Sequence, residues 1–544
     1  MVKSLLSLLS ARQNSILSGA AVLMLTVFAA KLLGLIKDRL LVHNFNTADA
    51  SVFFAASNLP DLLFQLLVLG TLSVAFIPIF TDHLHKNGER DAFEFASNIL
   101  NLSLLTFIVL ALVSFVFVSP INSLLVPGFS GRQKELTDQL TRVLLFSQVF
   151  LVIGSFFIGV AQSYQRCIIP SLGPLFYNLG IILGIVFFSG FGLIGPVVGV
   201  LIGSVLHVLI QFPLIKSLGF QYKLSFDLFN LGVREVFKLM SLRNISLVVE
   251  QLNERVGFAL ASTISSASPA VLTFSNHLFA APIGLFGSTI AQAALPVLSR
   301  EQAKGEVQSF KVTLLTTMHQ ILFLTLPAAA ILIVLRIPVV RLVFGAQQFS
   351  WDDTVLTGRT VALFALGLTA QSVIMLLVRG FYALKDTRTP VSVSVFTVLL
   401  NIALSALFVS VLKLDVWSLG LAYSITTNLA LALLIYLLNR KVGGFDLRSL
   451  LEPAMKMLVA AATAAVALYI PVKALDQLVF DTTRTANLIV LTAIASIFGL
   501  GIYILLVWLM EVKELGTFTE LLKRLARLQK NVKSQEIIPE TEAV

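Results

Sequence analysis

The chain has 544 residues, of which 57% are hydrophobic and 12% are charged, and its formal net charge is +10. Because an ordinary soluble domain has about 25% charged residues, this much apolar surface excludes a water-soluble fold and predicts a membrane protein. The basic residues do not cluster on a soluble domain, so the positive charge does not indicate nucleic acid as a partner.

Apolar runs of about 20 residues mark membrane-spanning helices. The first run resembles a signal peptide, but membrane segments follow it directly, and we interpret it as an uncleaved span. The seventh is interrupted by Glu250, Glu254 and Arg255. The sequence therefore predicts an all-α membrane protein with about fourteen spans, near residues 16–42, 50–80, 97–120, 140–163, 172–192, 195–215, 239–262, 270–298, 313–335, 360–382, 391–412, 416–438, 454–472 and 487–510.

The distribution of basic residues over the loops predicts the orientation. An even number of spans places both termini on one side, and the loops of that side carry most of the lysines and arginines, among them Lys216, Lys223 and Arg234. Because cytoplasmic loops are enriched in basic residues, residues 1–15 and the basic tail 511–544 are predicted to be cytoplasmic. The composition of the tail suits an interfacial helix on anionic lipid and a solvated tail equally well.

Segments in the two halves of the chain repeat. The stretch TLSVAFIPIFT at 71–81 resembles TIAQAALPVLS at 289–299, which begins 218 residues later, and a second pair aligns Pro170 with Pro390. An offset of six spans preserves orientation, and parallel halves with substrate between them are typical of transporters. The predicted organisation is two parallel six-helix lobes at 16–220 and 221–440, followed by two further helices at 441–510.

Charged residues interrupt equivalent helices of both lobes. The first span contains Lys31, Lys37 and Asp38, and the adjacent Glu254 and Arg255 lie in the seventh. A charge in the hydrocarbon costs about 2.5–3.5 kcal/mol on insertion scales and marks a candidate functional site. Lys31 and Asp38 are seven residues apart, hence on one helix face. The charges could line a hydrated substrate cavity, neutralise one another to lock the lobes together, or snorkel to the interface.

Motifs for catalysis are absent from the sequence. It has no phosphate-binding loop and no H-E-x-x-H zinc motif, and its single cysteine, Cys167, excludes a cysteine-based metal site. The adjacent carboxylates in WDDT at 351–354 fall in a predicted outside loop, where solvated carboxylates are the usual case. These absences favour transport over enzymatic chemistry. His277, inside the eighth span, is either a histidine bonded between helices or a cavity-lining group.

Several stretches resemble the MviN/MurJ family of bacterial lipid II flippases, within the multidrug, oligosaccharidyl-lipid and polysaccharide exporter superfamily. The resemblance covers roughly residues 15–510 and rests on KLLGLIKDRLLVHNF, NLPDLLFQLLVLGTLSVAFIPIF, LVPGF, YQRCIIPSLGPLFYN, NHLFAAPIGLFGSTIAQAALPVLS and GFYALKDTRTPV. It implies a central cationic cavity and a groove for the lipid tail at 441–510. The implied substrate is undecaprenyl-pyrophosphate-linked disaccharide pentapeptide, moved to the outer leaflet of the bacterial plasma membrane.

The sequence departs from this family at several charged positions. The family usually has arginine where this chain has Lys31 and Lys37, whereas Asp38 matches. An arginine pair of the second span falls on Phe64 and Gln65, a following glutamate falls on Leu69, and an arginine of the eighth helix falls on His277. Lysine keeps the Coulomb attraction for a pyrophosphate but loses the planar fork of donors that arginine provides. A cationic but weaker cavity is expected.

Transport of a lipid-linked oligosaccharide is the leading hypothesis, and it gives these residues roles. The pyrophosphate is expected to pair with Lys31, Lys37 and Arg255, with Asp38 orienting the basic groups. Membrane potential or a coupled monovalent ion is the expected energy source, without a cofactor or metal. The candidate substrate-binding residues are Lys31, Lys37, Asp38, Gln65, Arg255, Asn276 and His277, and candidates for an ion site or charge pair are Glu250, Glu254 and Asn401.

Other functions stay open at this point. Export of another polyprenyl-linked saccharide or of an amphipathic drug fits the same architecture. A non-transporting scaffold that binds cell-wall synthesis proteins is an alternative from a different class. A membrane glycosyltransferase fits poorly, because the sequence lacks a catalytic loop with paired carboxylates.

Overall fold

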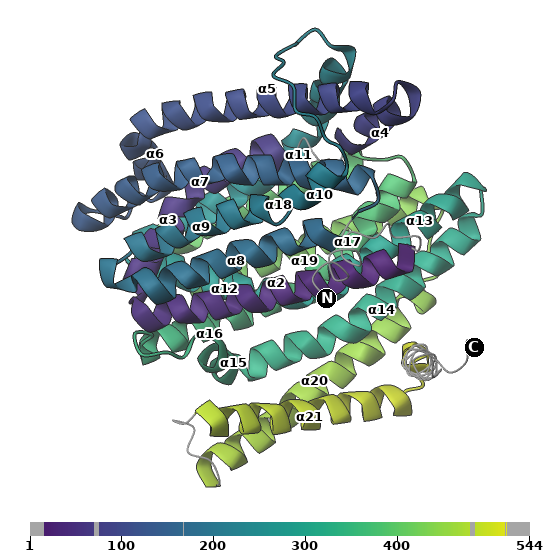
Figure 1. The fold of residues 1–544 in the computed structure, drawn as a ribbon. Helices are drawn as coiled ribbons and strands as arrows, with labels where there is room; N and C mark the ends of the chain where they lie inside the picture. Colours follow the sequence, from purple (N-terminus) through teal and green to yellow (C-terminus); the bar gives the residue numbers. More distant parts are fainter. Residues whose placement is uncertain (1–15, 70–75, 167, 479–484, 517, 519–544) are drawn as a thin grey trace, which may run out of the picture. The chain divides into compact units, whose positions relative to one another are not determined.

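The computed structural model describes residues 16–69, 76–166, 168–478, 485–516 and 518, and every regular element in them is a helix (Figure 1). The predicted all-α membrane fold is confirmed. The predicted N-terminal segment 1–15 and most of the tail lie outside the described residues.

The described helices follow one another along the chain. Those of the first part of the chain are α2 (Ile16–Asn44), α3 (Thr47–Phe64), the π-helix η1 (Gln65–Leu69), α4 (Ile77–Lys86), α5 (Glu89–Val116), α6 (Val118–Leu125), α7 (Gly131–Ser163), α8 (Ile168–Phe188), the 3₁₀ turn η3 (Ser189–Phe191), α9 (Ile194–Leu209), α10 (Phe212–Ser217) and α11 (Leu231–Ile264). The others are α12 (Ser268–Pro282), the π-helix η4 (Ile283–Ser288), α13 (Thr289–Ala303), α14 (Val307–Val334), α15 (Arg336–Phe344), α16 (Trp351–Ala365), α17 (Leu368–Ala383), α18 (Arg388–Ala406), the π-helix η5 (Leu407–Val411), α19 (Trp417–Lys441), α20 (Leu447–Leu478) and α21 (Thr485–Leu509).

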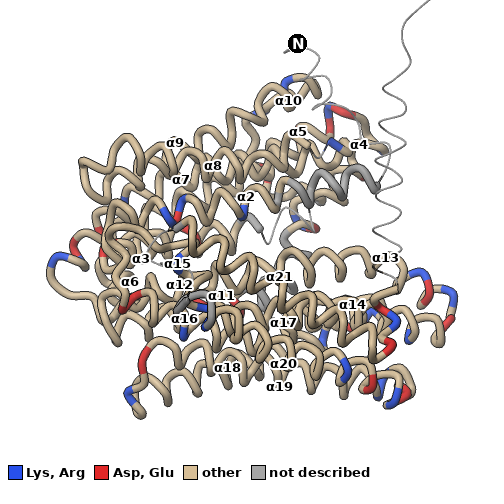
Figure 2. Tube along the Cα trace, turned by 90° about the horizontal axis from the view of Figure 1, so that it is seen from below, with Lys and Arg blue, Asp and Glu red and all other residues tan. Residues whose placement is uncertain are grey.

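Eleven helices of the described residues are long and apolar enough to cross a membrane, or twelve if α16 and α17, bent by 42°, form one span. The other two predicted spans fall on α2 and α11, which are helices of 29 and 34 residues. The count of fourteen therefore stays a prediction. Figure 2 shows most charged residues near helix ends and connections, as expected for helices whose middle parts lie in lipid.

The helices form two compact units. The first comprises the described residues up to Ala281 together with Val339–Phe364 and Val391–Ala430, and the second comprises Pro282–Pro338, Ala365–Pro390 and the described residues from Leu431 onward. The predicted lobes at 16–220 and 221–440 have different boundaries and stay a prediction.

Irregular turns recur with the spacing of the sequence repeat. The π-helices η1 and η4 begin 218 residues apart, at Gln65 and Ile283. The 3₁₀ turn η3 and the π-helix η5 begin at Ser189 and Leu407, with the same separation. Each pair lies in spans that the repeat makes equivalent, so the offset found in the sequence also relates the interruptions of the helices.

Glycines bring α8 and α9 of the first unit into close backbone contact, and α2 packs on the other side of α8 (Figure 1). A Cβ added at Gly180 would lie 2.2 Å from the Cα of Gly203, and one added at Gly184 would lie 2.3 Å from the Cα of Gly199. Small residues at such spacing let helix backbones approach in lipid, where van der Waals packing drives association.

Three long helices of the second unit share an alanine-rich interface. Helices α20 and α21 lie side by side in Figure 1, and α14 packs against α20. Met457, Ala460, Ala461 and Ala464 recur at helical spacing on α20 and are buried. The buried Tyr503 of α21 donates its hydroxyl to the carbonyl of Phe323 on α14 over 3.0 Å. Hydrogen bonds between spans supplement the close packing.

Candidate substrate-binding site

Asp38 is a buried carboxylate between two basic side chains. Only 1% of its side chain is exposed, and its Oδ2 lies 2.6 Å from Nδ1 of His277 on α12. Its Oδ1 lies 3.3 Å from Nζ of Lys37, the preceding residue on α2. The structure thus brings together three of the predicted residues, and the role of Asp38 in orienting the basic groups stays a prediction.

The other charges of α2 have separate surroundings. Lys31 is exposed and lies two helical turns before Asp38, so the predicted common face does not produce an ion pair between them. Arg39 donates to the carbonyl of Leu342 on α15 over 2.5 Å. The side chain of Lys37 is 15% exposed and is paired with Asp38.

Arg255 on α11 is held by neutral amides. Its guanidinium donates to Oδ1 of Asn58 over 2.5 Å and to Oε1 of Gln251 over 3.2 Å. The amide of Gln251 in turn donates to Oε1 of Gln65. The adjacent Glu254 is exposed. The charged pair expected of Glu254 and Arg255 is replaced by amide contacts, and neither of the two hydrogen-bond partners of the guanidinium carries a charge.

Asp61 on α3 belongs to the same region and was not among the residues predicted from the sequence. Its Oδ1 accepts a hydrogen bond from Nε2 of Gln148 on α7 over 3.0 Å. It lies close enough for the charges of Arg255, Glu254 and Lys37 to act on it. A signal was present in the sequence, because Asn58, Asp61 and Gln65 follow the i, i+3, i+7 spacing of one helix face.

Three other predicted residues lie beside these contacts. Asn401 on α18 is 9% exposed and donates from Nδ2 to Oδ1 of Asn253 on α11 over 2.8 Å. Glu250 is exposed on α11, and Asn276 is half-buried next to His277. Phe64, which stands where an arginine was expected, packs against the hydrophobic cluster of α4, α5 and α7.

We call the polar side chains of these three contact groups in the first unit the polar cluster. It combines two permanent cations, two carboxylates, one histidine and four amides, and its composition suits binding better than bond cleavage. A guanidinium offers a fork of donors to a phosphate, and amides both donate to and accept from sugars and peptides. The polar cluster consists of Lys37, Asp38, Asn58, Asp61, Gln65, Gln148, Gln251, Arg255 and His277.

Comparison with known proteins identifies the family. The family model described as lipid II flippase MurJ matches residues 45–490, most of the chain. This chain belongs to the MurJ family. The family is one of flippases, which are transporters and not enzymes, so the polar cluster is a candidate substrate site and not a catalytic one.

Curated relatives of the MurJ family align over most of their length. A probable lipid II flippase MurJ of Buchnera aphidicola subsp. Baizongia pistaciae (strain Bp) is 23% identical over 79% of this chain and 83% of its own. Those of Borreliella burgdorferi (strain ATCC 35210 / DSM 4680 / CIP 102532 / B31) and Rhizobium meliloti (strain 1021) are 25% and 27% identical, over 82% and 84% of this chain and 88% and 86% of their own.

Solved structures show the same fold. A lipid II flippase MurJ in an inward closed conformation matches with a TM-score of 0.74 and 23% identity, over 88% of this chain and 98% of that one. An inward-facing multidrug resistance transporter of the MATE family matches with a TM-score of 0.64 and 15% identity, over 76% and 94%. At these identities the likeness concerns the fold alone, and it places MATE transporters among the structural neighbours of this MurJ-family chain.

Proposed function

We propose that this chain translocates lipid II, the polyprenyl-pyrophosphate-linked peptidoglycan precursor, from the cytoplasmic to the outer leaflet by alternating access. The observation that carries the proposal is the guanidinium of Arg255, which neutral amides hold in place within a MurJ-family fold. Such a group is held in position by uncharged partners, so that an anion would have only the nearby carboxylate of Asp61 to compete with for the guanidinium.

The polar cluster suggests how the headgroup would be held. Arg255 would donate to the diphosphate while Lys31 attracts it from its exposed position on α2. Lys37 is paired with Asp38, so a diphosphate would compete with that carboxylate for the lysine. The amides of Gln65, Asn276 and their neighbours would bond the saccharide and peptide, and the polyprenyl tail would stay in lipid beside helices 441–510.

The proposal includes the orientation of the chain in the membrane and the energy source for transport. The basic loops support a place in the bacterial plasma membrane with both termini cytoplasmic. Membrane potential supplies about 2.3 kcal/mol per charge per 100 mV, enough to favour outward movement of an anionic headgroup. A monovalent ion bound at Glu250 or Asn401 and moved together with the substrate is the alternative energy source. Neither membrane potential nor such an ion requires a cofactor. Cell-wall synthesis proteins are the proposed protein partners.

Complementation tests the proposed substrate. The chain is expressed in cells depleted of their own lipid II flippase, and lipid II exposed on the outer leaflet is measured. We expect the wild type to restore exposure, Arg255→Gln to lose most of it, and Glu254→Gln, the exposed neighbour, to retain it. Failure of the wild type despite normal amounts in the membrane would refute lipid II as the substrate.

A second candidate substrate is another lipid-linked oligosaccharide or an amphipathic drug. It is favoured by the balance of the polar cluster, in which Asp38 and Asp61 offset Lys37 and Arg255 and four amides add no charge. Native mass spectrometry of the purified protein distinguishes the candidates. A co-purified pyrophosphate lipid with a peptide-bearing disaccharide supports lipid II, whereas a different saccharide or no pyrophosphate lipid supports the alternative.

A further inference from the structure

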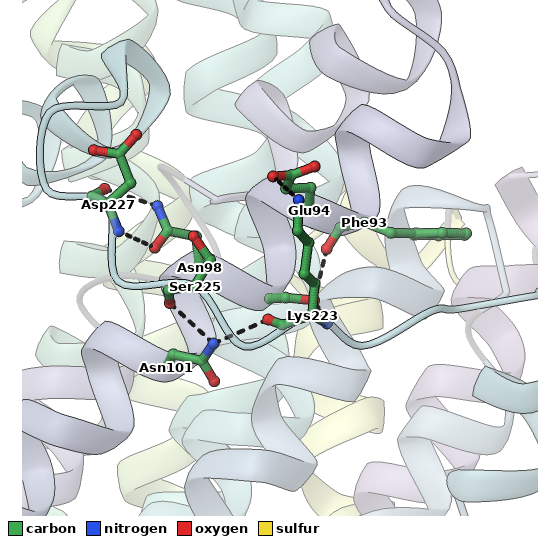
Figure 3. Close-up of polar contacts among 8 residues, drawn as sticks. Phe93, Glu94, Asn98, Asn101, Lys223, Ser225 and Asp227 are labelled. Carbon is green, nitrogen blue, oxygen red and sulfur yellow. Dashed lines mark hydrogen bonds and ion pairs between the residues drawn. The ribbon is translucent and has the colours of Figure 1, made fainter.

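An extended segment between α10 and α11 is fastened along the first turns of α5. We call residues 220–230 the strap. In Figure 3 the side chain of Asn98 makes both hydrogen bonds with the backbone of Asp227, donating to its carbonyl and accepting from its N–H, each over 2.8 Å. Asn101 donates to the carbonyls of Lys223 and Ser225 over 3.1 and 3.0 Å.

Further contacts complete the attachment of the strap. The N–H of Lys223 donates to the hydroxyl of Ser97 over 3.1 Å, and the ammonium of Lys223 pairs with Glu94. Tyr222 donates its hydroxyl to Oδ1 of Asn101 over 2.7 Å. Ser97, Asn98 and Asn101 are almost fully buried. Three buried polar residues of a membrane-spanning helix thus use their hydrogen-bonding capacity to fix one loop.

The fixed register gives the strap an apolar face. Residues 223, 225 and 227 bond α5 with their backbone groups, as alternate residues of an extended chain do along one edge. Leu224 and Phe226 lie between them, and Leu228 follows in the turn before α11. These three side chains are 70%, 50% and 57% exposed. Successive side chains of an extended segment point to opposite faces, so Leu224 and Phe226 are separated from Lys223 and Asp227.

The lipid surface is the occupant that fits this face. The exposed apolar residues of α5 begin at Leu105, one turn after Asn101, and continue through Val109 and Leu112, so the strap extends the lipid-facing surface of α5 toward its start. The basic residues Lys216 and Arg234 flank the strap, and anionic headgroups on the cytoplasmic leaflet attract such residues. Moving these apolar side chains from water into lipid is favourable.

We propose that the strap is an interfacial anchor whose Leu224, Phe226 and Leu228 insert at the boundary between headgroups and acyl chains. The leaflet follows from the proposed orientation, whereas the insertion is independent of which substrate is transported. Asn230, the last residue of the strap, caps α11 by accepting from the N–H of Gly232 over 2.9 Å. The anchor therefore fixes the start of the helix that carries Gln251 and Arg255.

Site-specific fluorescence in vesicles tests the anchor. Cys167 is the only cysteine, so Cys167→Ser provides a background in which Phe226→Cys is labelled with an environment-sensitive dye. The full-length protein is reconstituted in phosphatidylcholine and phosphatidylglycerol, with and without brominated acyl chains, and iodide is added as the aqueous quencher. We expect quenching by brominated lipid and an iodide quenching constant several-fold lower than at a solvated position.

Matched positions make the result decisive. Leu112→Cys on the exposed face of α5 reports the hydrocarbon, Glu306→Cys between α13 and α14 reports water, and Asp227→Cys reports the polar face of the strap itself. The proposal requires that brominated lipid quenches the label at position 226 about as strongly as at 112. It also requires that iodide quenches the label at position 227 about as strongly as at 306. If the label at 226 is quenched by iodide as at 306 and is insensitive to brominated lipid, the apolar face lies in water or awaits a protein partner, and the anchor is refuted. Leu228→Cys repeats the reading in case Phe226→Cys disturbs folding.

Discussion

Asp38 on α2 and His277 on α12 meet at 2.6 Å although 239 positions separate them in the chain. With Lys37 on its other oxygen, Asp38 connects two helices through one buried carboxylate. If a buried carboxylate loses its charge, its basic partners are left without a compensating charge. Removing one partner of a buried ion pair therefore destabilises a protein more than replacing the whole pair by apolar residues.

Asp38→Asn is therefore expected to destabilise the protein. The substitution keeps the shape of the side chain but leaves Lys37 beside a neutral amide. Breaking a fully buried pair costs about 3–5 kcal/mol, and we expect about 2 kcal/mol here because His277 is 38% exposed. Thermal unfolding in detergent measures the change, with Lys31→Gln as the control at an exposed position of α2. Equal melting temperatures for Asp38→Asn and the wild type would contradict the prediction.

Asp61→Asn is expected to strengthen binding of a diphosphate headgroup. The change removes a negative charge near Arg255 and Lys37, while the oxygen of asparagine can still accept from Gln148. Titration with a soluble lipid II analogue should give a Kd several-fold lower than for the wild type, with a difference that shrinks as salt increases. Weaker binding by Asp61→Asn would show instead that the carboxylate is needed to position Arg255.

Asp386, in the connection between α17 and α18, should contribute stability that depends on pH. Burial alone would raise the pKa of this carboxyl, but hydrogen bonds from Lys441 and Thr389 outweigh burial and lower the pKa to about 2. An unfolded chain has an aspartate pKa of about 3.9. A folded pKa below the unfolded one gives stability that is present above about pH 4 and is lost as the pH falls toward 2.

Asp386→Asn is accordingly expected to lower the melting temperature at neutral pH and to have little effect near the folded pKa of about 2. Thermal unfolding of both proteins across this acidic range checks the prediction. Asp352→Asn, at an exposed carboxylate in the first turn of α16, serves as the control. A difference between Asp386→Asn and wild type that stays constant down to the lowest pH would argue against the ion pair as its cause.

Gly203→Ala is expected to force α8 and α9 apart. The added Cβ would lie 2.3 Å from the backbone carbonyl oxygen of Tyr177, which cannot move without the helix. Overpacking of this kind costs about 1–3 kcal/mol, and we expect the upper part of that range. Gly190→Ala is the matched control, because nothing lies within 4 Å of a Cβ there. Thermal unfolding that ranks Gly190→Ala as the more damaging change would contradict the packing described for these helices.

The sequence predicted the helices best in the parts of the chain that lie in lipid, because backbone groups there must form their hydrogen bonds within a helix or a closed barrel. Long apolar runs predicted the helices, but α5 begins at Glu89 and α7 at Gly131, ahead of the predicted 97 and 140, because an apolar run marks only the part of a helix that lies in lipid. Polar ends of helices extend beyond that part, and their lengths depend on contacts such as those of α5 with the strap.

The partners within the polar cluster were harder to predict. Lys37 and Asp38 pair although adjacent, whereas Glu254 and Arg255 do not, and the difference depends on which neighbouring helix each side chain meets. Asp61 looked like a single charge in an apolar stretch because its partner Gln148 is 87 positions away. The polar stripe of α3 was readable from spacing, but its partners required the fold.

The π-helices η1 and η4 bear on the history of the chain. Each contains an extra residue, and losing it would rotate every following side chain by about 100° around the helix axis. Such insertions are hard to acquire twice with the same separation of 218 residues. One duplication of an ancestral gene segment that already had the wide turn explains both, and a family member with a wide turn at only one position would speak against it. Present differences between the halves then arose after the duplication. One example is Gln65, whose equivalent position in the second half is occupied by Ile283.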